Sequence, residues 1–309
     1  MKRYFQMKEK AISENQTIKK GCRRTIPLSI VLSCTAFLFL CGILLYIIIS
    51  NRLKVTHYII RADIVGSIRV VQLTDLHNAE FGEKNRKLVS LVAEQQPDII
   101  IMTGDMLVRE DPNTEIVTDL IRPLAAIAPV YFGYGNHESR WERIHSKSLV
   151  PILTDAGAYV LNNTFVDVEI NGQMYRIGGY MGYYRQPYMM TGDEDLVKVE
   201  KQFFEDFEDT EHFKILLNHI PTQWVDWKYI NKYPIDLVFS GHYHGGQMVL
   251  PFIGPVYAPY IGYDPPNVKG VFEGEMASCI LSTGLGNELW WLPRINNPPE
   301  IVVADITSG

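Results

Sequence analysis

The sequence predicts an α/β protein in which two mixed β-sheets face each other, helices cover their outer faces, and one apolar helix precedes them. Short, continuous apolar runs alternate with amphipathic segments over most of the chain, a pattern typical of strands buried between layers of helices. A run of 26 residues without a charged side chain, at 25–50, stands before this pattern.

The composition suits a folded chain and argues against one function class. Of 309 residues, 47% are hydrophobic and 21% are charged, as expected of a protein with a full core. Residues 1–24 carry eight basic and two acidic side chains, so the net charge of −6 leaves −12 on the rest. We expect no nucleic-acid partner, because phosphate backbones need a basic face. Cys279 is the only cysteine after residue 50, so we expect no internal disulfide in that part.

The apolar run at 25–50 predicts a transmembrane signal-anchor helix, since about 20 apolar residues span a bilayer. A cleaved signal peptide is the alternative, but its apolar region is usually only ~7–15 residues and precedes a small-residue cleavage site. The basic tail before the run predicts a cytoplasmic N-terminus. We therefore expect a single-pass protein of the cell membrane. Its parts would be a cytoplasmic tail at 1–24, the anchor at 25–50, a juxtamembrane segment at 51–67 and an extracytoplasmic domain at 68–309.

The rest of the chain predicts the following elements in order. Apolar runs predict strands at 68–74, 98–102 and 130–134, and amphipathic patterns predict helices at 86–94, 115–124 and 147–155. Further on we expect strands at 159–161, 165–170, 174–177, 213–217, 237–240, 247–250, 278–283 and 301–305, with a helix at 194–207. Asn171-Gly172 predicts a hairpin turn. The mixture of Pro, Gly and aromatics at 251–267 predicts an ordered, irregular loop.

Polar side chains follow five of the predicted strands directly. Since ligands of α/β proteins bind at the carboxyl ends of strands, we expect these side chains to meet in one cleft. They are Asp75 and His77, then Asp105, then Asn136 and His137, then His219, and finally His242 and His244.

The residue types at these strand ends predict a metal site. Carboxylate, amide and imidazole groups without thiolates suit Mn, Fe, Zn or Co and disfavour an iron–sulfur site. Each motif alone has an ordinary explanation: Asp-x-His and Gly-Asp occur in turns, a single His219 is more often structural, and GNHE also suits a helix cap. Five motifs in this order are much harder to explain as turns, and five of the eight histidines lie in them.

The ordered set D-x-H, G-D, G-N-H-E, H and G-H-x-H resembles that of the calcineurin-like metallophosphoesterases, from Ile68 to Asp305. The resemblance implies a four-layer α/β/β/α sandwich of two mixed sheets and two divalent metal ions, of unknown identity among Mn, Fe, Zn and Co. It implies that Asp75, His77 and His244 bind the first ion, that Asp105 bridges, and that Asn136, His219 and His242 bind the second. His137 would be catalytic without binding metal.

The resemblance also implies a reaction, the hydrolysis of a phosphodiester or pyrophosphate bond by in-line attack of a metal-bound hydroxide. The segments GHYHGGQ, GLG and PRINNPPEI resemble the YkuE/YaeI-like membrane-associated phosphodiesterases, some of which act on the lipid-linked UDP-2,3-diacylglucosamine. In the phosphoprotein phosphatases a D-R-G sequence comes after the corresponding aspartate. Here Met-Leu-Val follows Asp105 instead, which disfavours a protein phosphatase. Aromatic and methionine side chains crowd residues 180–190, 252–263 and 290–291, where they would either meet lipid or pack loops onto the core.

Three alternatives remain at this point. A broad-specificity phosphomonoesterase or nucleotidase of the cell surface would use the same ligands. A non-catalytic binding module on a membrane stalk would have lost some of them, and none is lost. A metal-independent Ser or Cys hydrolase would need a nucleophile motif, and no G-x-S-x-G is present. Glu138, next to His137, is expected either to orient a neighbouring histidine or to cap a helix.

Overall fold

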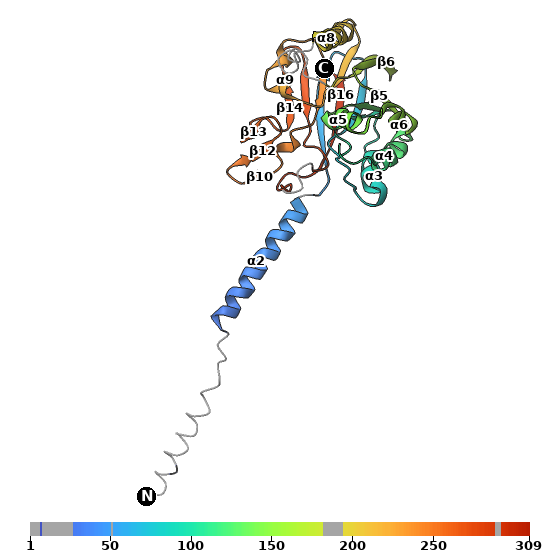
Figure 1. Cartoon of the computed structure of the whole chain (residues 1–309). Helices are drawn as coiled ribbons and strands as arrows, with labels where there is room; N and C mark the ends of the chain where they lie inside the picture. The colour runs from blue at the N-terminus through green and yellow to red at the C-terminus, as the bar shows by residue number, and fades with distance from the viewer. Residues whose placement is uncertain (1–6, 8–26, 51, 182–193, 288–291) are drawn as a thin grey trace. The chain divides into compact units, whose positions relative to one another are not determined.

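The chain was analysed as a computed structural model, which describes Met7 and residues 27–50, 52–181, 194–287 and 292–309 (Figure 1). Residues 1–48 and 49–309 form two compact units. Most of the predicted tail at 1–24, and the aromatic residues predicted at 182–190 and 290–291, lie outside the described residues.

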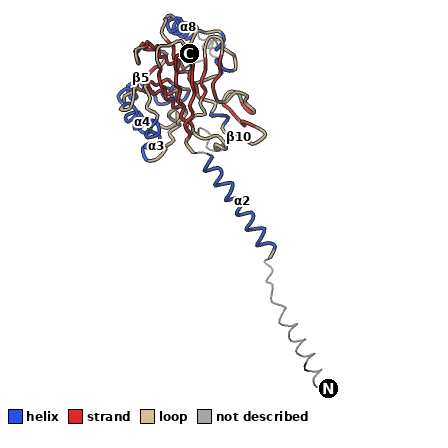
Figure 2. Tube along the Cα trace, turned by 180° about the vertical axis from the view of Figure 1, so that it is seen from behind, coloured by secondary structure: helices blue, strands red, loops and turns tan. Residues whose placement is uncertain are grey.

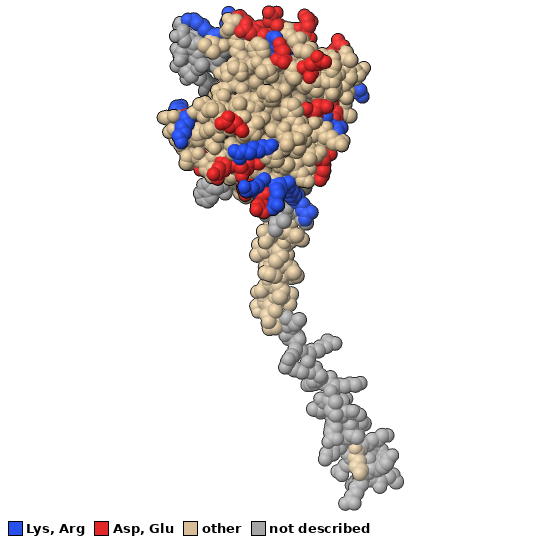
Figure 3. Space-filling model, turned by 90° about the vertical axis from the view of Figure 1, so that its right-hand side faces the viewer, with Lys and Arg blue, Asp and Glu red and all other residues tan. Residues whose placement is uncertain are grey.

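Helix α2, Leu28–Ser50, forms the described part of the first unit. It carries no charged side chain, as Figure 3 shows. Its segment Leu28–Tyr46 is long and apolar enough to cross a membrane, and a signal sequence near an N-terminus would have the same properties. The predicted apolar helix is therefore present, and its role as an anchor stays a prediction.

The first sheet of the second unit has six strands in the order β1-β16-β2-β3-β4-β5. Their bounds are β1 Lys54–Ala62, β16 Glu300–Ser308, β2 Ser67–Leu73, β3 Ile99–Met102, β4 Val130–Gly133 and β5 Ala158–Leu161. Strands β2 to β5 run parallel, whereas β16 runs antiparallel to β2 and parallel to β1. The parallel strands therefore end at one edge of the sheet.

The second sheet also has six strands, in the order β14-β15-β9-β8-β7-β6. Their bounds are β14 Gly270–Glu273, β15 Ser278–Leu281, β9 Leu237–Ser240, β8 Phe213–Leu217, β7 Gln173–Gly179 and β6 Thr164–Ile170. Strands β7, β8, β9 and β15 are parallel, and β6 pairs antiparallel with β7 across the predicted Asn171-Gly172 turn.

Three apolar clusters separate four layers. Inward side chains of both sheets, such as Val70, Ile101, Ile215 and Phe239, form the central cluster. The outer face of the first sheet packs on α3 Arg86–Glu94, α4 Glu115–Ala125, α5 Asn136–His145 and α6 Val150–Asp155, and that of the second sheet packs on α8 Glu194–Glu208 and α9 Thr222–Val225. Figure 2 shows the strands between α3 and α4 on one side and α8 on the other. The predicted fold class is confirmed.

The structure differs from the predicted elements in five places. Helix α9, Thr222–Val225, and strand β14, Gly270–Glu273, were not predicted. The stretch 51–67 contains β1, which pairs with β16 along its whole length, although we predicted no element there. Helix α5 begins at Asn136, within the GNHE motif, where we predicted only a turn or a helix cap. The irregular loop at 251–267 instead contains parts of two small hairpins, β10 Val249–Leu250 with β11 Gly254–Pro255, and β12 Tyr257–Ala258 with β13 Gly262–Tyr263. Short 3-10 turns complete the described elements at Glu83–Asn85, Tyr229–Asn231 and His244–Gly246.

Candidate metal centre

The carboxyl ends of β2, β3 and β4 in one sheet and of β8 and β9 in the other lie together. Two buried hydrogen bonds join these edges. His219 Nδ1 lies 2.7 Å from the Thr103 carbonyl oxygen, and Gln72 Nε2 donates to the Ser240 carbonyl oxygen at 2.9 Å. All the strand-end residues predicted from the sequence are brought to this place, and apart from the half-buried Asn136 they are buried.

One group of possible ligand atoms comes from Asp75, His77 and His244. The Nε2 atoms of His77 and His244 are 3.3 Å apart, and Asp75 Oδ1 lies 3.5 Å from His244 Nε2 and 4.0 Å from His77 Nε2. Ligands about 2.0–2.2 Å from a shared ion are separated by roughly 3–3.5 Å. Both distances to His244 Nε2 fall in this range, and the 4.0 Å between Asp75 and His77 is longer.

A second group comes from Asp105, His219 and His242. His219 Nε2 is 3.0 Å from Asp105 Oδ2 and 3.2 Å from His242 Nδ1. Asn136 Oδ1 is buried and accepts no hydrogen bond from any described residue. An amide oxygen without a donor is costly when buried, and a cation at this place would satisfy it. The residues present therefore fit a metal ion.

The position of His219 also suits a ligand. A carbonyl oxygen only accepts, so the contact with Thr103 places a proton on Nδ1 of His219. With an ion bound and the ring neutral, the lone pair of Nε2, which lies 3.0 Å from Asp105 Oδ2, would be the ligand atom. Ligating histidines in proteins usually donate their other ring N–H in this way.

Burial and mutual charge shift the pKa values of these groups. Burial raises the pKa of Asp75 to about 6, against the attraction of His219. Burial lowers the pKa of His219, but the carboxylates of Asp105 and Asp75 outweigh this and raise it to about 10. Burial, followed by the charges of His77 and Arg294, lowers the pKa of His244 well below its usual range. The carboxylates hold a positive charge here without metal, which is the charge that divalent ions would supply.

The backbone is strained at the same place. A positive φ between +46° and +70° is uncommon for residues other than glycine, and costs on the order of 1–3 kcal/mol each. Five of the seven predicted ligands have it: Asp75, His77, Asp105, His242 and His244. Gly135 lies against the carboxylate of Asp105, and Gly241 lies against that of Asp75. A Cβ at either glycine would collide with the carboxylate.

Glu138 holds two of the ligand-bearing loops. Its carboxylate accepts the backbone N–H of Gly135 at 2.8 Å, of Asp105 at 2.8 Å and of Met106 at 2.9 Å. It thus caps α5, as one of the two expectations had it, and also fixes the turn after β3. Burial, followed by the charge of Asp105, raises the pKa of Glu138.

His137 lies beside both groups of ligands. Its backbone N–H donates to Asp105 Oδ1 at 2.8 Å, and its ring centroid is 4.6 Å from that of His77. The Arg109 backbone N–H lies 3.3 Å from His137 Nδ1, and Arg109 Nη1 lies 3.5 Å from His137 Nε2, so a donor group of Arg109 faces each ring nitrogen.

Two arginines near the site were missed in the sequence. Arg109 places Nη1 at 3.5 Å from His137 Nε2. Arg294 is buried, donates to the carbonyl oxygens of Gly286 and Thr283 at 2.7 and 2.8 Å, and lies 3.4 Å from His244 Nδ1. Burial lowers the pKa of Arg294 to about 10. In the sequence, only their positions could have indicated a role in the site. Arg109 comes four residues after Asp105, and Arg294 lies in the PRINNPPEI segment.

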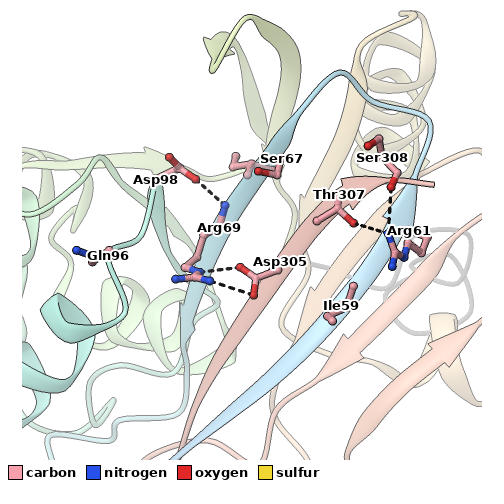
Figure 4. A pocket seen from close by; sticks show the side chains of 10 residues that line it. Ile59, Arg61, Ser67, Arg69, Gln96, Asp98, Asp305, Thr307 and Ser308 are labelled. Carbon is pink, nitrogen blue, oxygen red and sulfur yellow. Dashed lines mark hydrogen bonds and ion pairs between the residues drawn. The ribbon is translucent and has the colours of Figure 1, made fainter.

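A cavity of about 550 Å³ lies at the other end of the strands and has a different character (Figure 4). It adjoins the start of β2, where Arg69 pairs with Asp305 at 2.6 Å and Arg61 donates to the Ser308 carbonyl oxygen at 3.2 Å. Arg69 and Asp305 in this cavity pair with each other, and the groups of possible metal ligands found among the described residues all lie elsewhere.

Cys279 cannot replace the metal centre as a nucleophile. Its side chain is fully buried in the cluster beneath α8 and α9, and burial raises the pKa of the thiol to about 12. A thiolate is the reactive form, and it is absent at neutral pH under these conditions.

The fold and the clustered Asp and His side chains define a metal-dependent phosphoester hydrolase. The model of the calcineurin-like phosphoesterase family matches residues 68–246, more than half of the chain, and the chain belongs to this family. The predicted family resemblance is confirmed.

Three relatives narrow the branch. The chain is 27% identical over 271 residues to the uncharacterized metallophosphoesterase YkuE of Bacillus subtilis, covering 84% of this chain and 87% of YkuE. It is 25% identical over 252 residues to the phosphodiesterase YaeI of Escherichia coli, covering 79% and 84%. It is 25% identical over 277 residues to the UDP-2,3-diacylglucosamine pyrophosphatase LpxG of Chlamydia trachomatis, covering 76% and 82%. The predicted YkuE/YaeI-like branch is confirmed.

Proposed function

We propose that this protein is a membrane-anchored phosphodiesterase or pyrophosphatase that works with two divalent metal ions. Asp75, His77 and His244 would hold one ion, and Asn136, His219 and His242 the other. Asp105 would bridge, since its carboxylate approaches ring nitrogens of both His77 and His219 within 4.8 Å. One observation carries the proposal. The two groups of possible ligands lie together at the strand ends, and the buried Asn136 Oδ1 beside them accepts no hydrogen bond from a described residue.

The metal ions, when bound, supply Lewis acidity that activates water near neutral pH and offsets charge on the phosphoryl oxygens. The chain supplies the remaining groups. His137, whose backbone N–H donates to Asp105 and whose ring lies against that of His77, would donate a proton from its ring to the leaving oxygen or to a phosphoryl oxygen. Glu138 keeps the loops of Asp105 and Asn136 in register, and burial of the whole site strengthens each electrostatic contact.

The substrate is proposed from the names of two relatives. YaeI is named a phosphodiesterase and LpxG a pyrophosphatase of a diacylated nucleotide sugar. A lipid-linked phosphodiester or pyrophosphate therefore fits this chain, with residues 25–50 holding the enzyme at the membrane that contains such a substrate. The domain after residue 51 would lie outside the cytoplasm.

One assay tests the reaction. The full chain in detergent is given a 4-nitrophenyl phosphodiester and a 4-nitrophenyl phosphomonoester, with EDTA and then with Mn, Zn or Mg added back. We expect diester hydrolysis that EDTA abolishes and a metal restores. The Asp105→Asn variant should lose at least about a thousandfold in kcat while keeping its circular dichroism spectrum, because the bridging carboxylate is removed. Activity that survives EDTA would contradict the proposal.

The lipid substrate needs a separate comparison. A diacylated nucleotide diphosphate sugar in mixed micelles is compared with its deacylated, soluble form under the same conditions. We expect a higher kcat/KM on the acylated form. Equal values would remove the case for lipid while leaving the hydrolase in place.

A further inference from the structure

A cavity of about 250 Å³ adjoins the candidate metal centre and contains two arginines for which the proposed hydrolysis has no use. Its wall includes Asn136, Arg140 and Arg143 of α5, together with Met181, Ile220 and Tyr260. Since Asn136 is a proposed ligand, the cavity opens where the reacting phosphate would be held.

The helix places both arginines on the side of Asn136. Arg140 and Arg143 follow Asn136 by four and seven residues, which puts all three on one face of α5. They stand about 6 Å and about 10 Å from Asn136 along the helix axis. A side chain as long as arginine's covers that distance, so a group attached to the reacting phosphate would come within reach of both.

Neither arginine is used in the part of the chain that the structure describes. No ion pair or side-chain hydrogen bond joins Arg140 or Arg143 to a described residue. The acidic side chains of the same helix are engaged elsewhere: Glu138 accepts three backbone N–H groups, and Glu142 accepts Tyr134 Oη at 2.9 Å and the Leu149 N–H at 2.7 Å. Two guanidinium groups without an ion pair to any acid in the described ranges attract an anion, and their planar N–H groups match phosphate oxygens.

The rest of the cavity lining includes apolar and aromatic side chains, Met181, Ile220 and Tyr260. Ile220 directly follows the proposed ligand His219 and is buried. The ring of Tyr260, in the turn between β12 and β13, stacks on the proposed ligand His242 with centroids 4.8 Å apart. An anion alone would not use these side chains, whereas an anion that carries an organic group would contact them as well as the arginines.

We propose that this cavity binds a second phosphate of the substrate, so that the enzyme prefers pyrophosphate diesters to simple phosphodiesters. The inference deepens the proposed function and rests on it. Arg140 and Arg143 hold the phosphate that is not attacked, while the metal centre holds the one that is. The apolar and aromatic side chains contact the group esterified to the second phosphate.

The test compares two substrates that differ by one phosphate, the 4-nitrophenyl esters of thymidine monophosphate and of thymidine diphosphate. We expect the full chain to have a higher kcat/KM on the diphosphate ester. Arg140→Gln/Arg143→Gln should raise KM for that ester about ten- to hundredfold, because charged hydrogen bonds are lost, and change kcat/KM for the monophosphate ester less than about twofold. Arg140→Lys/Arg143→Lys should keep part of the preference. Arg122→Gln is the control, since Arg122 lies on α4 and pairs with Asp119.

Binding separates this inference from the proposed hydrolysis. Equilibrium dialysis of each ester with the Asp105→Asn variant, alone and combined with Arg140→Gln/Arg143→Gln, needs no turnover. Tighter binding of the diphosphate ester that the arginine changes abolish supports the subsite even if neither ester is cleaved. Equal binding of the two esters, or an equal loss on both, overturns the subsite even where hydrolysis is observed.

Discussion

The proposed ligands occupy backbone conformations that their own residue types disfavour. Asp75, Asp105 and His242 have φ of 53°, 52° and 70°, in the left-handed region that residues other than glycine adopt uncommonly. Contacts from distant segments hold them there, such as the His242 N–H donating to both oxygens of Asp75 at 3.1 Å. Strain of this kind persists where the surroundings over-determine it, and it collects at functional sites.

Glu138 gives the first prediction at this scale. Glu138→Gln keeps the size of the side chain but turns an –NH₂ group toward backbone donors that the carboxylate now accepts. We expect the free energy of unfolding to fall by about 1–3 kcal/mol, because a buried donor loses its acceptor. The activity should fall as well, since the loops of Asp105 and Asn136 lose their common support. Urea unfolding and diesterase kinetics measure both.

Glu94→Gln is the matched control for this substitution, because Glu94 is exposed at the end of α3. It should change neither the unfolding free energy nor kcat by a measurable amount. If Glu138→Gln behaved like this control, the cap would have no part in the site.

The residue scale also shows what a sequence reveals of such a site. Every candidate found from the sequence directly follows an apolar strand, and a strand is a strong local signal. Arg294 has no such signal, because it reaches His244 from 50 residues further along the chain and lies in an irregular segment. The roles of Arg140 and Arg143 depend on the helix α5, which was not predicted because its sequence NHESRWERIH contributes only Trp141 to the core as a large apolar side chain.

At the scale of elements, the buried strands were predictable, whereas two of the four edge strands, β1 and β14, were not predicted. Strands β2, β3, β4, β8 and β9 are short apolar runs whose side chains are nearly all buried. Strand β1, KVTHYIIRA, has one buried residue, Ile60, and polar residues that an edge tolerates. Its partner β16 lies at the other end of the chain, and no local pattern reports a pairing across such a separation.

The second prediction concerns this strand. A fragment 52–309 contains β1, whereas a fragment 63–309 lacks it and leaves the edge of β16 without a partner. We expect the shorter fragment to have a Tm lower by at least about 5 °C, since Ile60 and the ladder to β16 are lost. It should also aggregate sooner, because a long unpaired edge strand invites pairing between chains. Thermal unfolding and light scattering measure the two effects, and equal stability of the fragments would show that β1 is dispensable.

At the scale of the whole molecule, the chain joins two units with surfaces of different character. Residues 49–309 form a unit whose described part has four buried apolar clusters and whose sequence is net acidic, while Leu28–Tyr46 exposes large apolar side chains. Water does not favour such a helix, and a bilayer does. A phosphoesterase on this stalk would work at a membrane surface, where a lipid-linked diphosphate is already concentrated.

The basic tail predicts the direction in which the stalk points. Lys and Arg close to a span favour the cytoplasmic side, so residues 1–24 should lie inside and the hydrolase unit outside. With an epitope tag on the N-terminus, protease added to intact cells should digest the hydrolase unit and spare the tag, while a cytoplasmic marker stays whole.

Replacing Lys19, Lys20, Arg23 and Arg24 by Gln should let part of the protein insert the other way, because the difference in charge across the span largely disappears. Replacing the exposed Arg52 and Arg61 by Gln, on the other side of the span, should sharpen the original orientation instead. A hydrolase unit protected in intact cells would place the reaction in the cytoplasm and reverse this assignment.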